Sequence, residues 1–116
     1  MSDTNANLLN GRRFIMVSST ASEVNAEAPT RFTYEEADGL IWGSYDGDTV
    51  IQGRFVGTRD DDRVELSYVH ALKAGGRAGG RSSSRIETLP DGRLRLVEEF
   101  VFDGDDTPQV SVCEEV

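Results

Sequence analysis

The sequence is poor in the residues that cross-link small domains or bind metal ions. It contains one cysteine, Cys113, and one histidine, His70. A single cysteine excludes an intramolecular disulfide and a cysteine-based zinc cluster. A single histidine leaves no basis for a histidine-rich metal site or a classical catalytic triad. We therefore predict that the protein has no bound metal and no cofactor.

Long apolar runs and excess positive charge are also missing. No run approaches the roughly 20 apolar residues of a membrane-spanning helix. Residues 1–10 have neither the basic start nor the apolar stretch of a signal peptide. Twelve Lys and Arg against 21 Asp and Glu give a net charge of −9, which repels nucleic-acid phosphates and anionic membranes. We expect a cytoplasmic protein that binds neither nucleic acid nor a membrane.

The chain has 116 residues, of which 37% are apolar. This length suits one compact domain with a modest core and is too short for two. We predict a single domain over residues 1–116, with residues 1–10 as a flexible N-terminal tail.

Short apolar runs with a period of two alternate with turn signals. Gly and Asp punctuate the chain, as in Asp38-Gly39, Asp46-Gly47 and Pro90-Asp91-Gly92, and such pairs favour tight hairpins because Gly adopts positive φ. No window of 11 or more residues carries a helical stripe. The pattern predicts eight strands, at residues 12–19, 30–36, 40–45, 49–58, 63–71, 81–88, 93–102 and 109–115.

Eight consecutive antiparallel strands must hide the two edges of their sheet. Closure into an up-and-down barrel achieves this and leaves an interior wide enough for side chains or one small ligand. A two-sheet sandwich is the alternative. Because each strand pairs with its neighbour in sequence, we predict an all-β, eight-stranded antiparallel up-and-down barrel.

Turn geometry predicts which residues face the interior. A type I turn with a glycine bulge at Pro90-Asp91-Gly92 would pair Leu89 with Arg93. The turns near residues 37–39, 46–47 and 60–61, interpreted in the same way, set the register of the neighbouring strands. Together they predict one continuous inward face around the barrel. The residues predicted on that face are Phe32, Tyr34, Leu40, Trp42, Ile51, Gly53, Phe55, Val64, Leu66, Tyr68, His70, Ser82, Ser84, Ile86, Thr88, Leu94, Leu96, Glu98, Phe100 and Phe102.

The two ends of the predicted barrel differ in the length of their connections. Residues 20–29, 72–80 and 103–108 would form long loops at one end, whereas the other end has only tight turns. Long loops suggest an open mouth. Five aspartates would make this mouth acidic, at positions 46, 48, 103, 105 and 106, and the glycine-rich stretch 74–80 would form a flexible flap over it.

Glu98 interrupts the apolar alternation of its strand. A carboxylate in an apolar setting is costly unless it is paired or protonated, and burial raises its pKa. Such a group can act as a general acid or base. The alternatives are a structural hydrogen bond to Ser84 across the strands, or an outward orientation through a shift in register.

His70 is the second candidate for acid–base chemistry, because imidazole titrates near neutral pH. The structural alternative is a rim histidine bonded to water. Aromatic walls with a few converging polar groups are typical of small-molecule pockets. We predict ligand contacts from Phe32, Tyr34, Trp42, Phe55, Tyr68, Ser84 and Phe100, although each of the aromatic residues could also be simple core filling.

Three stretches resemble a known group of small bacterial proteins: Leu9–Phe14, Gly39–Gly47 and Ser84–Leu96. Members of that group often carry the name N-acetylglutamate synthase, and the resemblance runs from Leu9 to Val116. The expected architecture is similar to the calycin type of barrel, as in lipocalins and avidins. That resemblance implies a barrel that binds a small molecule.

Three functions follow from these observations. The first is a barrel that binds a small organic molecule. The second is an enzyme in the same cavity, either a cyclase or isomerase using Glu98 and His70 or the N-acetylglutamate synthase named above. The third is a structural protein with a filled barrel. Apolar residues on the outward parity also predict a homodimer; they are Ile15, Val17, Ile41, Val97 and Val101.

Overall fold

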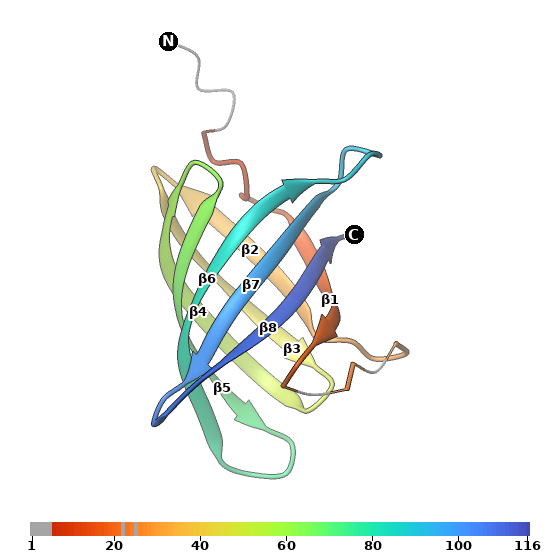
Figure 1. Ribbon diagram of the computed structural model, residues 1–116, viewed down its shortest axis with the longest axis vertical. Helices are drawn as coiled ribbons and strands as arrows, with labels where there is room; N and C mark the ends of the chain where they lie inside the picture. Colours follow the sequence, from red (N-terminus) through yellow and green to blue (C-terminus); the bar gives the residue numbers. More distant parts are fainter. Residues whose placement is uncertain (1–5, 22, 25) are drawn as a thin grey trace.

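The computed structural model describes residues 6–21, 23–24 and 26–116. Its strands form one closed antiparallel barrel in which each strand pairs with its neighbours in sequence and the last strand pairs with the first (Figure 1). The predicted up-and-down barrel is therefore confirmed, and the sandwich is excluded. The strands are β1 (Arg13–Ser19), β2 (Arg31–Ala37), β3 (Leu40–Gly47), β4 (Val50–Asp60), β5 (Arg63–Leu72), β6 (Arg77–Thr88), β7 (Leu94–Phe102) and β8 (Asp105–Glu115).

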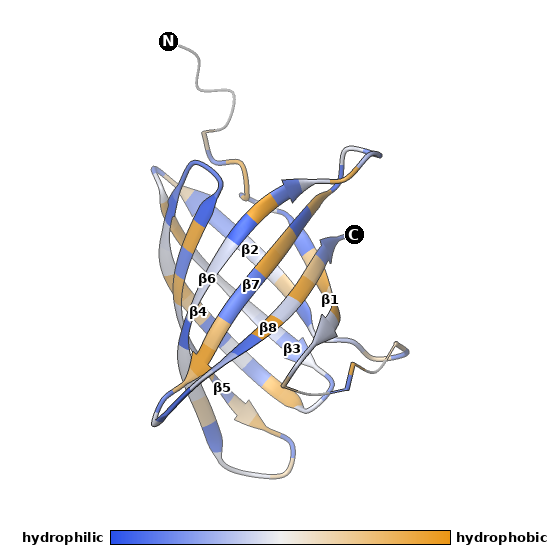
Figure 2. Cartoon of the chain, in the orientation of Figure 1, coloured by the Kyte–Doolittle hydropathy of each residue, from blue (hydrophilic) through white to orange (hydrophobic). Residues whose placement is uncertain are grey.

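Alternating hydropathy along the strands builds the interior (Figure 2). Successive side chains of a strand point to opposite faces, so one set gathers inside the barrel and the other faces water. The inward set forms one continuous apolar cluster. Its buried members are Leu9, Phe14, Tyr34, Ile41, Tyr45, Val50, Phe55, Val64, Leu66, Leu94, Leu96 and Cys113.

The turn between β6 and β7 has the predicted geometry. The amide of Leu89 donates to the carbonyl of Arg93 at 2.8 Å, and the amide of Gly92 donates to the carbonyl of Leu89 at 2.9 Å. Gly92 has a φ of 91°, a conformation that glycine adopts without steric cost. This register places Leu94 and Leu96 in the core, as predicted.

The register between β2 and β3 differs from the prediction by one residue. Ala37 pairs with Leu40, so the turn has two central residues, Asp38 and Gly39, with φ of 52° and 80°. Two positive φ values define the type I′ hairpin turn. A slip of one residue turns every side chain to the opposite face. The predictions for β3 were therefore wrong: Leu40 and Trp42 lie on the outer wall, and Ile41 is in the core.

A shift in register between β3 and β4 returns the side chains of β4 to the orientation that the sequence predicted. Gly47 pairs with Val50, whereas Tyr45 pairs with Gly53, so the register shifts within the hairpin. As a result Phe55 faces the interior, as predicted. Ile51 does not, because a further shift between Val50 and Gln52 turns Val50 inward and leaves Ile51 57% exposed.

The connections at the mouth are shorter than the sequence suggested. β6 begins at Arg77 and pairs with β5, and β8 begins at Asp105. The expected flap is therefore a hairpin, and the expected loop at 103–108 is a tight turn. The connection between β1 and β2 stays long, and residues 22 and 25 within it lie outside the described residues.

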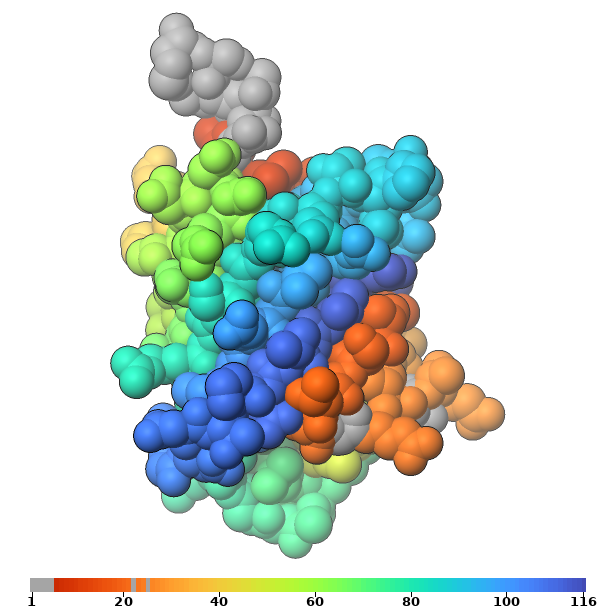
Figure 3. All heavy atoms as spheres, viewed as in Figure 1, coloured from red at the N-terminus to blue at the C-terminus, as the bar shows by residue number. Residues whose placement is uncertain are grey.

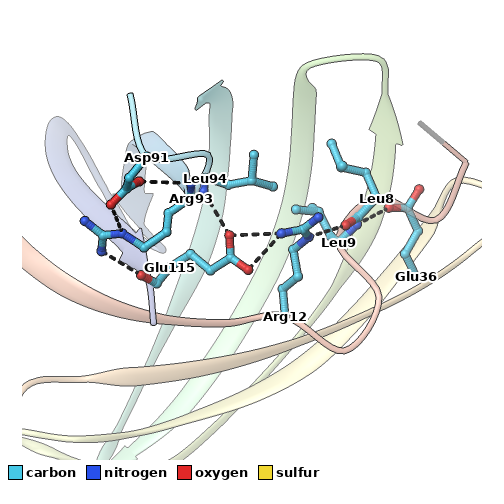
Figure 4. Close-up of polar contacts among 8 residues, drawn as sticks. All are labelled: Leu8, Leu9, Arg12, Glu36, Asp91, Arg93, Leu94 and Glu115. Atoms are coloured by element: carbon cyan, nitrogen blue, oxygen red, sulfur yellow. Dashed lines mark hydrogen bonds and ion pairs between the residues drawn. The ribbon is translucent and has the colours of Figure 1, made fainter. Parts of the chain in front are cut away.

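The segment before β1 packs against the core at the opposite end of the barrel (Figure 1), and Figure 4 shows its polar contacts. Leu9 is fully buried, and its amide donates to Oε1 of Glu36 at 3.0 Å. Glu36 also accepts from Nε of Arg59 at 2.8 Å, with the two side chains only 1% and 7% exposed. The predicted tail thus packs as a plug from Leu8 onward, and residues 1–5 lie outside the described residues.

Polar contacts at this end also stabilise the pairing of β1 with β8, the first and last strands of the barrel. Arg12 donates to both carboxylate oxygens of Glu115 at 2.8–2.9 Å, and Glu115 accepts from the amide of Leu94 (Figure 4). In Figure 3 the atoms of β8 lie between those of β7 and β1 across this face of the barrel.

No helix capable of crossing a membrane occurs in the described parts of the chain.

The buried ion pair gives the first prediction. Glu36→Gln keeps the side-chain shape but removes the carboxylate charge from this buried ion pair, which is expected to lower the free energy of unfolding by about 3–5 kcal/mol. Chemical denaturation measures this loss. The matched control is Asp91→Asn, which breaks the exposed pair with Arg93 and should change stability far less. Equal losses in the two variants would contradict the assignment of Glu36 as a structural anchor.

Candidate functional site

A cavity of about 260 Å³ occupies the barrel on the mouth side of the core. Its wall is mainly apolar, with polar groups at the bottom and at the rim. The residues that line it are Met16, Ser19, Ala21, Thr30, Phe32, Tyr34, Tyr45, Asp48, Thr49, Val50, Phe55, Leu66, Tyr68, His70, Leu72, Ala78, Ser82, Glu98, Phe100 and Phe102. The predicted mouth, bordered by the β3–β4 turn, is therefore the open end.

Most of the predicted site residues meet in this cavity. Phe32, Tyr34, Phe55, Tyr68, His70, Glu98 and Phe100 all line it. Trp42 does not, because the register of β3 places it on the outer wall, 44% exposed. Ser84 is buried beside Glu98 in the register of β6 and β7, but it is not part of the cavity wall.

Aromatic rings shape the wall. Phe32 stacks on Tyr45 with ring centroids 5.2 Å apart, and Tyr34 contacts Phe55 at 4.6 Å. The Tyr45 ring lies against Gly53 and the Phe55 ring against Gly43, where a Cβ atom would collide with each ring. Glycine at these two positions lets the rings lie flat against the neighbouring strand and leaves the centre of the barrel open.

Glu98 lies among small hydroxyl side chains at the bottom of the cavity. Its register partners are Ser84 on β6 and Ser111 on β8. The alternative of a structural hydrogen bond to Ser84 is not found; instead the hydroxyl of Ser111 donates to Oε1 of Glu98 at 2.9 Å. Burial raises the pKa of Glu98, and the hydroxyls of Ser82 and Ser111 partly oppose that shift. The expected raised pKa is thus confirmed in direction.

Two further serines lie at this level. Among the described residues, the buried Oγ atoms of Ser82 and Ser84 make no hydrogen bond of good geometry, although the Ser82 hydroxyl lies near enough to Glu98 to lower the pKa of that carboxyl. A buried polar atom without a well-formed hydrogen bond costs free energy. Ser82 also lines the cavity, where a ligand could bond to it.

His70 lies higher in the cavity and is joined to Tyr45. The Tyr45 hydroxyl and Nδ1 of His70 are 2.7 Å apart. Burial lowers the pKa of His70 and raises the pKa of Tyr45, so both groups are uncharged at neutral pH. Sequence reasoning missed Tyr45 because the error in the β3 register turned it outward. It also missed Ser111, since no pattern singled out that residue.

Metal binding has no evident site here. Within residues 6–21, 23–24 and 26–116, no group of three or more His, Cys, Asp or Glu side chains is arranged to hold an ion.

Comparison with known proteins agrees with this geometry. The sequence model of the avidin-like protein family matches residues 7–116. The chain therefore belongs to the avidin-like family, as its closed eight-stranded barrel and interior cavity indicate. No curated protein and no solved structure matches it significantly. The similarity to calycin barrels is thus confirmed at the level of the avidin-like family.

The raised pKa of Glu98 predicts a pH-dependent stability. A carboxyl whose pKa is higher in the folded state stabilises the fold in its protonated form, and this contribution is lost as pH rises through the folded pKa. Glu98→Gln removes the titration. The variant should match or exceed the wild type in stability at pH 7, and its advantage should shrink toward pH 4.

Denaturation curves of wild type and Glu98→Gln across this pH range measure the difference. Glu99→Gln is the control, since it removes the same charge from the exposed neighbour on β7. A loss of more than about 2 kcal/mol in Glu98→Gln at pH 7 would instead make Glu98 a structural anchor.

Proposed function

We propose that the protein binds a small, mostly apolar organic molecule inside the barrel. The observation that carries this proposal is the open cavity of about 260 Å³, walled by aromatic rings and ending at the half-buried carboxyl group of Glu98. Pockets for small molecules combine apolar walls with a few polar groups that fix orientation. Membership of the avidin-like family supports the same function.

The size of the cavity limits the ligand. Ligand pockets commonly measure about 300–1,000 Å³, so this one suits a molecule of one or two fused rings. Such a ring system would contact Phe32, Tyr34 and Phe100 on the wall, while a polar substituent would reach Glu98 and Ser82 at the bottom.

Binding of 6-propionyl-2-(dimethylamino)naphthalene, an uncharged dye of two fused rings that fluoresces more strongly in apolar surroundings, tests the proposal. The wild type should bind it with a fluorescence increase. Leu66→Trp should reduce that increase at least tenfold, because Leu66 lines the cavity and the indole fills it. Ser67→Trp is the matched control, since Ser67 is the exposed neighbour on β5.

Circular dichroism confirms that both variants fold. The absence of dye binding to the wild type, or an equal response in the two folded variants, would show that the cavity does not take up apolar molecules.

Acid–base catalysis in the same cavity is a second candidate. Glu98 and His70 both line the cavity, and burial moves their pKa values toward each other. Native mass spectrometry finds a co-purified ligand, and chromatography of that ligand before and after incubation separates the two functions, because isomerisation leaves the mass unchanged. A ligand that keeps both its mass and its retention time supports binding alone, whereas conversion that is lost in Glu98→Gln supports an enzyme.

N-acetylglutamate synthesis is less well supported by the cavity. Glutamate carries two carboxylates, and acetyl-coenzyme A carries several phosphates. Among the lining residues the charged side chains are Asp48 and Glu98, and none is Lys or Arg. An anionic substrate would therefore lie next to carboxylates without a counter-charge.

We also propose that the protein is a homodimer, as the outward apolar residues suggested. Ile41 does not contribute, because it is in the core. The larger exposed apolar set lies on the outer wall of β3–β5, where Trp42 is the register partner of Val56. Its members are Leu40, Trp42, Val56 and Val69, each 44–58% exposed.

Light scattering at micromolar concentration tests the dimer. The wild type should have twice the mass of one chain, and Trp42→Lys should shift it to the monomer because a charge would be buried at the contact. Val110→Lys, on β8, serves as the control. A monomeric wild type would contradict this proposal.

A further inference from the structure

The charges around the cavity are of one sign. Asp48 and Glu98 are its acidic lining residues, His70 is uncharged at neutral pH because burial lowers its pKa, and the described lining includes no Lys or Arg. The whole chain carries a net charge of −9. A cleft lined by charges of one sign concentrates ions of the opposite sign.

The bottom of the cavity contains acceptors that need a donor. Oε1 of Glu98 receives one hydrogen bond, from Ser111. A carboxylate has about four acceptor positions, so further positions are open to a ligand. Ser82 is 7% exposed and lines the cavity, and its Oγ lies near Glu98 but makes no hydrogen bond of good geometry. An N–H group beside Glu98 would satisfy these atoms.

The walls are also suited to a positive group. Tyr45, Tyr68, Phe32 and Phe100 line the path from mouth to bottom, and the faces of aromatic rings attract cations. Tyr68 uses its hydroxyl for the carbonyl of Val101 at 2.9 Å, which fixes its ring in the wall. An anion in the same position would lose its water without gaining a counter-charge.

We propose that the ligand is an arylalkylamine: a flat apolar ring system with a primary ammonium group, on a short alkyl chain, that pairs with Glu98. This inference rests on the proposed binding function and specifies its ligand. The ring occupies the aromatic part of the cavity, and the ammonium group donates hydrogen bonds to the Glu98 carboxylate and the Ser82 hydroxyl.

Three indole compounds of closely matched size provide the test: tryptamine is a cation, tryptophol is neutral and indole-3-acetate is an anion. Isothermal titration calorimetry at pH 7 measures their affinities for the wild type. Tryptamine should bind at least tenfold more tightly than tryptophol, and indole-3-acetate should bind most weakly of the three.

Two variants with matched chemistry locate the selectivity. Glu98→Gln should weaken tryptamine binding at least tenfold while changing tryptophol binding less than threefold. Glu99→Gln removes the same charge from the outer wall and should leave the tryptamine affinity within twofold of the wild type. An equal loss in both variants would assign the effect to net charge and overturn the pairing with Glu98.

The outcomes separate this inference from the proposed function. If the neutral dye binds but the three indoles bind equally, or the anion binds best, the cavity takes up ligands without selecting a cation and the inference fails. It fails also if the dye binds and no indole does. If neither the dye nor any indole binds, the proposed function itself fails.

Discussion

The pairing of β1 with β8 is the contact on which the cavity depends, because it converts an eight-stranded sheet into a closed wall. β1 is joined to β2 through only three register pairs, from Arg13 to Ile15. The ion pair of Arg12 with Glu115 and the hydrogen bond from the amide of Val116 to the carbonyl of Arg13 reinforce the other side. Without these contacts both edges would be exposed and the interior would be open to water.

The plug before β1 links the closed end of the barrel to the packing of the core. Leu9 fills the closed end, and its amide shares Glu36 with Arg59. Glu36 and Arg59 come from β2 and β4, so one buried ion pair ties three segments together. The Glu36 carboxylate accepts hydrogen bonds from the Leu9 amide and the Arg59 guanidinium, whereas the half-buried Glu98 accepts one from the hydroxyl of Ser111. The two carboxyl groups therefore differ in how far the fold compensates their charge.

The fold was predictable from the sequence because its signals are local. Alternating apolar residues and Asp-Gly turns specify strands and hairpins one pair at a time, and an up-and-down barrel requires no other pairing. The register was not equally predictable. Ala37-Asp38-Gly39 suits a two-residue or a three-residue turn, and the structure adopts the two-residue turn. As a result Trp42 faces outward and Tyr45 faces inward, opposite to the prediction. The irregularity near Gly47 shifts the register by one more residue and so restores the predicted orientation on β4. Phe55 was therefore correctly placed although its neighbours on β3 were not.

The candidate site was predictable where one strand carried the signal. Glu98 and Phe100 follow from the alternation of β7 alone. Ser111 and Tyr45 require contacts between strands, which depend on exact register, and the plug requires the packing of a segment without strand periodicity. Glu36 was missed because its position in a run of two glutamates, Glu35 and Glu36, resembles an ordinary exposed strand end.

The outward position of Trp42 determines what spectroscopy can observe in this protein. Trp42 is the single tryptophan of the chain and lies on the opposite side of the wall from the cavity. Selective excitation of its indole reports on the polarity of the outer surface, including any contact that the proposed dimer would make there. Occupancy of the interior is visible instead through the tyrosines, because Tyr34, Tyr45 and Tyr68, the three of the chain, all line the cavity. The two chromophores thus monitor separate events in one molecule.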